Sequence, residues 1–334
     1  MSKRKVRCKA CNNELIRNGR DKNGKQRYRC TRCQQTSHYP SQSKDEKLFE
    51  LFRQYVLFGL TYEVLSYQSG ISVKTLHTAF TSFLGHLPFQ EEPSSQVRSR
   101  SHVLLIDGLW FNRWFVLIVY RESGDLKILR ISTGEKELKR HIVFDLQMLS
   151  ATGYLFNGIT TDGGKPILGA IQKVYPTLPH QICLAHMHRA VISNLGRKPT
   201  DLRVLFLKQI ADLVWYVDTK EKKNAWSLLV DSWIERHRDF LDEKRTDDTR
   251  RWWYVHRKVR KACRLLDAIF FHSFTFLDYP HLPKTTNEIE AQFGHLGKRW
   301  LAHRGLHRKR WEIFMKWFVF FYNQEQNRKN KKTV

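Results

Sequence analysis

The sequence predicts a mixed α/β protein: a mixed sheet with helices on both faces, interrupted by an all-α insertion and preceded by two small modules. Three observations predict this class. From residue 102 to residue 186, apolar runs and amphipathic segments follow the order strand, strand, strand, helix, strand, helix, strand. The segment 187–280 is helical by periodicity and has no acid at a strand end. Two Cys-x-x-C pairs and three short amphipathic segments precede the first strand.

The composition favours a polyanionic partner. The 334 residues suffice for one large core plus small modules, and 58 Lys and Arg against 32 Asp and Glu give a net charge of +26. Nucleic acid is therefore expected ahead of an anionic membrane surface. The 10 Trp argue against a disordered basic chain. The most apolar window, 103–120, is interrupted by charged residues such as Asp107, so no membrane span is expected.

The first module, residues 1–40, contains the pairs Cys8-Lys-Ala-Cys11 and Cys30-Thr-Arg-Cys33. Together they can complete a tetrahedral thiolate site for Zn²⁺, which predicts a zinc ribbon. The charged start of the chain shows no secretory signal, so an intracellular protein with metal-bound thiolates is favoured over disulfides. Redox-active or incidental cysteines are the alternative. Abundant Lys and Arg favour contact with DNA phosphates, while a purely structural or protein-contact role stays open.

The second module, residues 41–85, is expected to be a DNA-binding helix-turn-helix. Residues 45–58 are amphipathic, and Thr61 and Ser72 are placed to cap a second and a third helix. The outward positions of the third helix, which would face a major groove, are Val73, Lys74, Thr75, His77 and Thr78. A small helical connector with a solvated face is the alternative. The Pro- and Ser-containing stretch 86–101 is expected to be a linker.

The α/β core is expected to start at residue 102 and to run to residue 188. Its predicted elements are strands at 102–107, 114–120 and 126–132, a helix at 136–149, a strand at 155–162, a helix from 163 and a buried strand at 179–186. The insertion, 189–280, is predicted to hold helices at 202–216, 221–236 and 252–271, with an exposed charged segment at 242–251. Residues 281–326 are expected to return to the core as helices, before a disordered basic tail at 327–334.

Two acids stand at the predicted ends of strands. Asp107 and Asp162 should therefore meet at one edge of the sheet, where a third acid from a later helix could join them. Packed carboxylates repel one another, and Mg²⁺ ions with oxygen ligands remove that repulsion. Two such ions can activate a nucleophile on a phosphodiester. The alternative for each acid is an ordinary turn residue beside glycine.

The candidate third acid lies in the stretch 284–299. Pro283 precedes it, and Thr285, Thr286 and Asn287 offer N-cap oxygens for a helix. Glu288 and Glu290 fall in its first turn. At about 100° per residue they point to nearly opposite faces, so only one can reach a site. That acid is either a metal ligand or a surface ion-pair partner of Lys298 and Arg299.

These motifs resemble those of the Mutator-like DDE transposases and their bacterial insertion-sequence relatives. The resemblance covers residues 100–325 and rests on Asp107 after an apolar strand, Thr161-Asp162-Gly163, Cys183-Leu-Ala-His186, Thr285-Thr-Asn-Glu-Ile-Glu290 and Arg304-Gly305. It implies an RNase H-like core with a helical insertion. It also implies DNA cleavage at transposon ends and strand transfer with Mg²⁺ or Mn²⁺.

The resemblance also implies roles for individual residues. Asp107, Asp162 and Glu290 would form the catalytic triad and hold the metal, and the motif spacing after Asn287 selects Glu290 over Glu288. Glu288 would then face solvent. Cys183 and His186 would be structural residues near the site, although by chemistry they could be half of a metal site. Lys298, on the face of Glu290, becomes a candidate phosphate contact, with Arg299 and Arg304 as further DNA contacts.

The leading expectation is a metal-dependent transposase that binds double-stranded transposon ends and target DNA as a homodimer or larger assembly. Its expected location is the nucleoid of a prokaryotic cytoplasm, away from membranes. One alternative is a catalytically inactive, transposase-derived DNA-binding protein, and another is an RNase H-like nuclease without strand transfer. Trp252 and Trp253 either stack an unpaired base or pack in the core.

Overall fold

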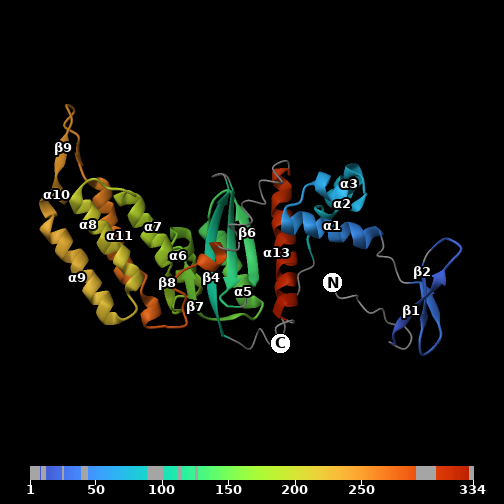
Figure 1. Ribbon diagram of the computed structural model, residues 1–334. Helices are drawn as coiled ribbons and strands as arrows, with labels where there is room; N and C mark the ends of the chain where they lie inside the picture. Colours follow the sequence, from blue (N-terminus) through green and yellow to red (C-terminus); the bar gives the residue numbers. More distant parts are fainter. Residues whose placement is uncertain are drawn as a thin grey trace. The chain divides into compact units, whose positions relative to one another are not determined.

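The computed structural model describes residues 8, 13–24, 26–38, 44–88, 101–111, 115–124, 127–290 and 306–330 (Figure 1). These residues divide into two compact units, Met1–Ser82 and Phe83–Val334, and each is described by itself. Several predicted positions lie outside the described residues: Cys11, Lys298, Arg299, Arg304, most of the linker and the last residues of the tail.

The described part of the first unit contains a small antiparallel sheet and three helices. The strands, in the order β1-β2-β3, are β1 (Leu15–Arg20), β2 (Gln26–Cys30) and β3 (Thr36–His38). The helices are α1 (Lys44–Phe58), α2 (Tyr62–Ser69) and α3 (Val73–Phe83). Thr61 caps α2 by accepting from the Val64 N–H, and Gly70 ends α2 in the left-handed conformation at φ 69°. Both ends of α2 therefore follow from local sequence.

The second unit is built on a five-stranded mixed sheet, which confirms the predicted α/β class. The strand order is β6-β5-β4-β7-β8, with β4, β5 and β6 antiparallel and β7 and β8 parallel to β4. The strands are β4 (Ser101–Phe111), β5 (Phe115–Glu122), β6 (Ile128–Gly134), β7 (Leu155–Thr161) and β8 (His180–Ile182). β5 is buried along its whole length, as expected of a strand covered on both faces.

Helices cover the sheet on opposite faces. α5 (Lys139–Ala151) and α6 (Lys165–Val174) pack on the face that carries Leu104, Ile106 and Tyr120. The hydroxyl of Tyr120 donates to Asp145 of α5 at 3.0 Å. Arg121, the next residue on β5, points to the other face because side chains alternate along a strand. On that face Arg121 is close to Glu288. It is also close to Tyr322, which belongs to the long C-terminal helix α13 (Arg308–Asn330).

The insertion is helical but not all-α as predicted. Its helices are α7 (Leu184–Leu195), α8 (Leu202–Asp212), η1 (Leu213–Tyr216), α9 (Lys220–Arg236), α10 (Arg238–Asp242), α11 (Arg257–His272) and η2 (Thr275–Leu277). A hairpin, β9 (Lys244–Thr246) and β10 (Trp252–Tyr254), stands between α10 and α11. The Asp247 carboxylate accepts from the N–H groups of Thr249 and Arg251 and closes the turn.

Trp252 and Trp253 thus lie on a strand of that hairpin rather than in a helix, and they are 57% and 44% exposed. The alternative prediction, that this pair packs in the core, is therefore wrong.

Three further predictions need correction. β4 continues past Asp107 to Phe111 because its antiparallel pairing with β5 continues, so this acid lies within the strand. β8 ends at Ile182, and Leu184–His186 begin α7 instead, because the Leu184 N–H turns away to bond the carbonyl of Lys284. Residues 327–330, expected to be disordered, extend α13. Among the described residues, no helix is long and apolar enough to span a membrane.

Asn323 ties α13 to the edge strand β6. Its side chain accepts from the Ile128 N–H at 3.1 Å and donates to the Ile128 carbonyl at 2.8 Å, as a neighbouring strand would. We expect Asn323→Ala to lower the unfolding free energy by about 1–3 kcal/mol, since two backbone groups lose their partner. Urea unfolding measures this. Gln324→Ala, one residue along the same helix, is the matched control, and equal losses in both variants would contradict the prediction.

Candidate metal centre

Asp107 is the most buried acid of the candidate centre. It follows the last parallel pair of the β4–β7 ladder, Ile106 with Thr161, and its side chain is almost fully buried at 2% exposure. The hydroxyl of Thr286 donates to its Oδ2 at 2.8 Å. Burial raises the pKa of Asp107 to about 6, against the opposing influence of His186 and Thr286, and the carboxylates of Asp162 and Glu290 raise it further.

Asp107, His186 and Glu290 come together from three separate segments. One potential ligand atom of each lies within 4.8 Å of the others, so this group could hold a metal ion. His186 is in the first turn of α7, and its Nε2 is 3.4 Å from Glu290 Oε1. Glu290 belongs to a helical turn, 287–290, that starts just after Thr286. Two carboxylates and an imidazole suit a divalent cation such as Mg²⁺, Mn²⁺ or Zn²⁺.

Asp162 is a neighbour of Asp107, His186 and Glu290 but is not a member of this potential ligand group. It follows β7 directly, and its Oδ1 accepts from the Gly164 N–H at 2.9 Å. Its charge reaches Asp107, whose pKa it helps to raise. Of the three acids predicted to meet, Asp107 and Glu290 are thus joined by His186, while Asp162 flanks them.

Arg189 is a neighbour of the centre that sequence reasoning missed. Its guanidinium donates to both carboxylate oxygens of Glu290, at 3.1 Å for the Nη1–Oε2 contact. This hydrogen bonding lowers the pKa of Glu290. Arg189 follows His186 by three residues on α7, so both project from one helical face. That spacing was the available signal.

Glu137 is a second neighbour that sequence reasoning missed. It lies between β6 and α5, and its carboxylate is so close to Gly108 and Gly164 that a Cβ on Gly108 would be 2.3 Å from its Oε1. Burial, followed by the charge of Asp162, raises the pKa of Glu137. Gly108, next to Asp107, and Gly164, two residues after Asp162, therefore leave room for a further carboxylate.

Cys183 lies next to the centre and contacts two of its residues, Thr286 and His186. It is fully buried at the start of α7, and its sulfur accepts from the Thr286 N–H at 3.3 Å. Although burial raises the pKa of this thiol, hydrogen bonds with His186 and Thr286 lower it overall. Its sulfur is not in the ligand group of the described residues, so Cys183 orients Thr286 and His186 instead.

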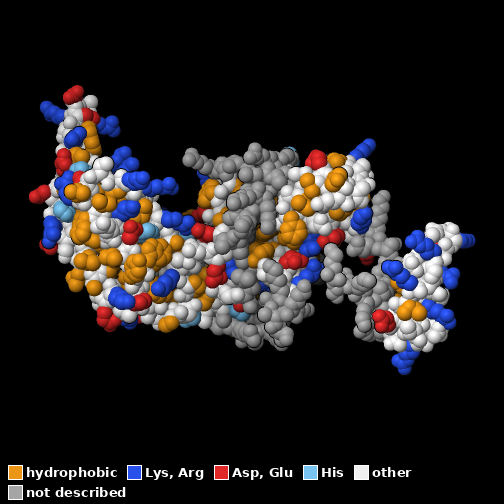
Figure 2. Space-filling view, viewed as in Figure 1, with side chains coloured by type: hydrophobic (Ala, Val, Ile, Leu, Met, Phe, Trp, Pro, Cys, Tyr) orange, Lys and Arg blue, Asp and Glu red, His pale blue; other side chains and the backbone are white. Residues whose placement is uncertain are grey.

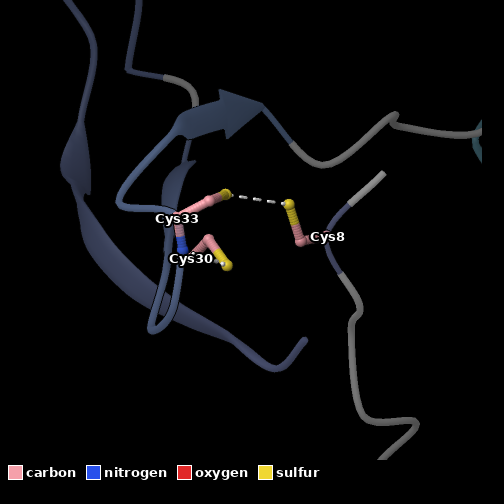
Figure 3. Close-up of side chains that lie close together, drawn as sticks. All are labelled: Cys8, Cys30 and Cys33. Carbon is pink, nitrogen blue, oxygen red and sulfur yellow. Dashed lines mark hydrogen bonds between the residues drawn. The ribbon is translucent and has the colours of Figure 1, made fainter. Parts of the chain in front are cut away.

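A second candidate metal site lies in the first unit. The sulfurs of Cys8, Cys30 and Cys33 are all within 4.8 Å of one another and could hold a metal ion (Figure 3). Cys30 ends β2, and its sulfur accepts from the N–H groups of Arg32 and Cys33 at 3.4 Å. Such backbone donors stabilise a thiolate, as a metal ligand requires.

The predicted groove-facing residues of α3 differ in their surroundings. Lys74 and His77 are exposed. Thr75 is half-buried, and its hydroxyl and N–H both contact the Ser72 hydroxyl, at 2.9 and 3.3 Å. Thr75 therefore takes part in the cap of α3, whereas the other four predicted residues, Val73, Lys74, His77 and Thr78, are exposed.

Comparisons with known proteins do not assign the chain to a family. No family model matches it, and no curated protein matches it. One similar solved structure is a ROK family transcriptional regulator, a homolog of the E. coli MLC protein, with 12% identity and a TM-score of 0.19. The match covers 45% of this chain and 49% of the regulator, so the chain spans about half of that protein's length. A TM-score this low does not establish a shared fold.

The raised pKa of Asp107 predicts how stability depends on pH. Its folded pKa of about 6 lies above the ordinary aspartate value of 3.8, so the folded state binds the proton more tightly. The corresponding stability is present below pH 4 and is lost as the pH rises to about 6, on the order of 2–3 kcal/mol. In a chelating buffer, Asp107→Asn should gain stability relative to wild type across this window. A difference in unfolding free energy that stays constant from pH 4 to 7 would contradict this.

The cysteine cluster predicts zinc in the purified chain. Cys30→Ser removes its most buried thiolate, so the zinc content should fall from about one ion per chain to almost none. Elemental analysis measures this, and Cys263→Ser, a buried cysteine of α11 in the other unit, is the control that should keep its zinc. Equal zinc in wild type and Cys30→Ser would refute the site.

Proposed function

We propose that this chain is a DDE-type DNA transposase that binds transposon ends and catalyses metal-dependent DNA cleavage and strand transfer. The observation that carries the proposal is the meeting of Asp107 and Glu290 at one candidate metal centre, from opposite ends of a long insertion. The strand order β6-β5-β4-β7-β8, three antiparallel strands followed by two parallel ones, supports an RNase H-like core. In this proposal Asp107, Asp162 and Glu290 form the catalytic triad.

The residues around the centre have distinct tasks in this reaction. Mg²⁺ or Mn²⁺ would be held by Asp107, Glu290 and Asp162 and would supply the activation of a water or 3′-hydroxyl and the neutralisation of the departing oxygen. Thr286 orients the Asp107 carboxylate toward the centre. Arg189, whose side chain is 52% exposed, brings a positive charge to the place where a phosphodiester would lie.

The surface supports a nucleic-acid partner. The net charge is +26, and Figure 2 shows Lys and Arg side chains spread over the insertion and over the first unit. In the proposal, the first unit is a zinc ribbon followed by a helix-turn-helix that recognises transposon ends. The exposed Trp252 and Trp253 and the nearby Lys244 offer stacking and charge to a separated strand. The reaction would take place on DNA in a prokaryotic cytoplasm.

Assembly of two or more copies is part of the proposal, because two ends must be brought together. The outer face of α8 carries apolar side chains that remain exposed, among them Leu202 at 77% and Phe206 at 52%. In Figure 2 hydrophobic side chains gather over this part of the insertion. Such a surface fits contact with a second copy of the chain.

One specific observation favours the alternative of an inactive DNA-binding protein. Both oxygens of Glu290 already accept from Arg189, and Asp162 lies outside the group that contains Asp107 and Glu290. A centre held in this way would bind DNA without cutting it. The transposase and the inactive DNA-binding protein differ in one activity: only the transposase cuts DNA with a metal ion bound by the three acids.

Cleavage of a DNA substrate that carries the element's ends tests the proposal. Wild type should nick it in Mg²⁺ and join the 3′ end to a plasmid, whereas Asp107→Asn and Glu290→Gln should reduce cleavage by at least about 10³-fold while end binding persists. Glu235→Gln, on the exposed side of α9, is the matched control. Cleavage without joining would favour the nuclease. Binding without cleavage by wild type would favour the inactive protein.

A further inference from the structure

Arg121 is a fully buried arginine in the middle of the sheet. It belongs to β5 and its exposure is 0%. Among the described residues it is the largest side chain that is fully buried. Its Nη2 lies 3.1 Å from Glu288 Oε2, an ion-pair distance without hydrogen-bond geometry. Among the described residues, its three nitrogens have no hydrogen-bond acceptor. A buried charge of this kind is costly unless an anion is held beside it.

Glu288 supplies that anion from an unexpected position. Sequence reasoning placed this glutamate in solvent, and its side chain is 41% exposed, but the Oε2 atom that faces Arg121 is buried. The expectation of a solvated Glu288 therefore holds only in part, because one of its two carboxylate oxygens is buried against Arg121. Burial lowers the pKa of the Arg121 guanidinium, while Glu288 and then Tyr322 of α13 counteract this. The acid is thus fixed where the sheet, the 287–290 turn and α13 come together.

The register of the sheet relates Arg121 to the metal centre. Leu105 is paired with Arg121 and Asp107 with Val119, and directly paired residues share one face of a sheet. Arg121 and Asp107 consequently lie on the same face, two residues apart along the strands. The 287–290 turn crosses that face, with Thr286 bonded to Asp107 and Ile289 completely buried.

The two glutamates of this turn are drawn in different directions. Glu288 and Glu290 are separated by about 200° around the helix axis, since each residue advances about 100°. One contacts Arg121 and the other contacts His186 and Arg189. With Glu288 fixed on the sheet, rotation of the turn about its axis is restricted, and Glu290 stays directed toward Asp107.

We infer that Arg121 is a positioning residue: its ion pair with Glu288 sets the rotation of the 287–290 turn and so places Glu290 at the metal centre. The inference rests on the proposed function only in taking Asp107 and Glu290 as metal ligands. It assigns a task to Glu288, which the transposase resemblance leaves without one. Loss of the pair should weaken metal binding even where the protein remains folded.

Mn²⁺ binding to the full-length, zinc-loaded chain, followed by electron paramagnetic resonance, tests this inference. The key variant is the double change Arg121→Met with Glu288→Gln, which removes both charges and leaves no unpaired ion in the sheet. We expect it to unfold near the wild-type midpoint and to bind Mn²⁺ about 10- to 100-fold more weakly, the loss typical of a residue that orients a metal ligand. Glu235→Gln should change neither quantity.

Glu288→Asp provides the test should the double variant not fold. It keeps the charge next to Arg121 but shortens the side chain, so the turn must shift to keep the pair. Positioning predicts weaker Mn²⁺ binding in this variant, and a folded double variant or Glu288→Asp with wild-type affinity would overturn the inference. Wild type that binds no Mn²⁺ in an Asp107-dependent way would overturn it too. Wild type that binds Mn²⁺ but leaves DNA intact would refute the transposase proposal alone.

Discussion

The hydrogen bond from Thr286 to Asp107 is the contact on which the candidate centre depends. It joins residues 179 positions apart in the chain and satisfies a carboxylate that burial would otherwise penalise. The segment before Thr286 is hydrogen-bonded to β7 and to the start of α7. The Thr160 hydroxyl donates to the Pro283 carbonyl, and the Leu184 N–H donates to the Lys284 carbonyl. Each step brings the turn that carries Glu290 nearer to β4.

The insertion can be large because its first helix, α7, follows β8 directly and its last residues are hydrogen-bonded back to β8. The side-chain amide of Gln181 donates to the Ser273 carbonyl at 2.7 Å, and its oxygen accepts from the Phe276 N–H at 3.1 Å. Thr275 adds a hydrogen bond to the His180 carbonyl. The chain therefore leaves the core at α7 and returns beside the same strand. The geometry of the site consequently does not depend on the length of the insertion.

Sequence reasoning recovered those parts of the protein that local patterns determine. The succession of strands and helices along the core, the Thr61 cap of α2 and the candidate ligands Asp107 and Glu290 follow from apolar runs, turn residues and motif spacing. Apart from the local β9–β10 hairpin, the missed features depend on contacts between distant segments. Nothing local marks Arg121 as the partner of Glu288 or Glu137 as the neighbour of Asp162, and the β9–β10 hairpin was hidden by a charged segment that reads as an exposed loop.

The two acids at the centre are in opposite electrostatic situations. Arg189 lowers the pKa of Glu290, whereas burial raises that of Asp107 toward neutrality. Below about pH 6, a divalent cation bound by both would have to displace the proton of Asp107, and at any pH it would share Glu290 with the Arg189 guanidinium. Because the pKa of Asp107 is raised to about 6 while that of Glu290 is lowered, Asp107 is the acid that holds a proton in mildly acidic solution, and cation binding releases that proton. Arg189 remains close enough to meet the negative charge of an incoming phosphate. Below about pH 6 the centre thus combines one ligand that is already ionised, Glu290, with one that cation binding must ionise, Asp107.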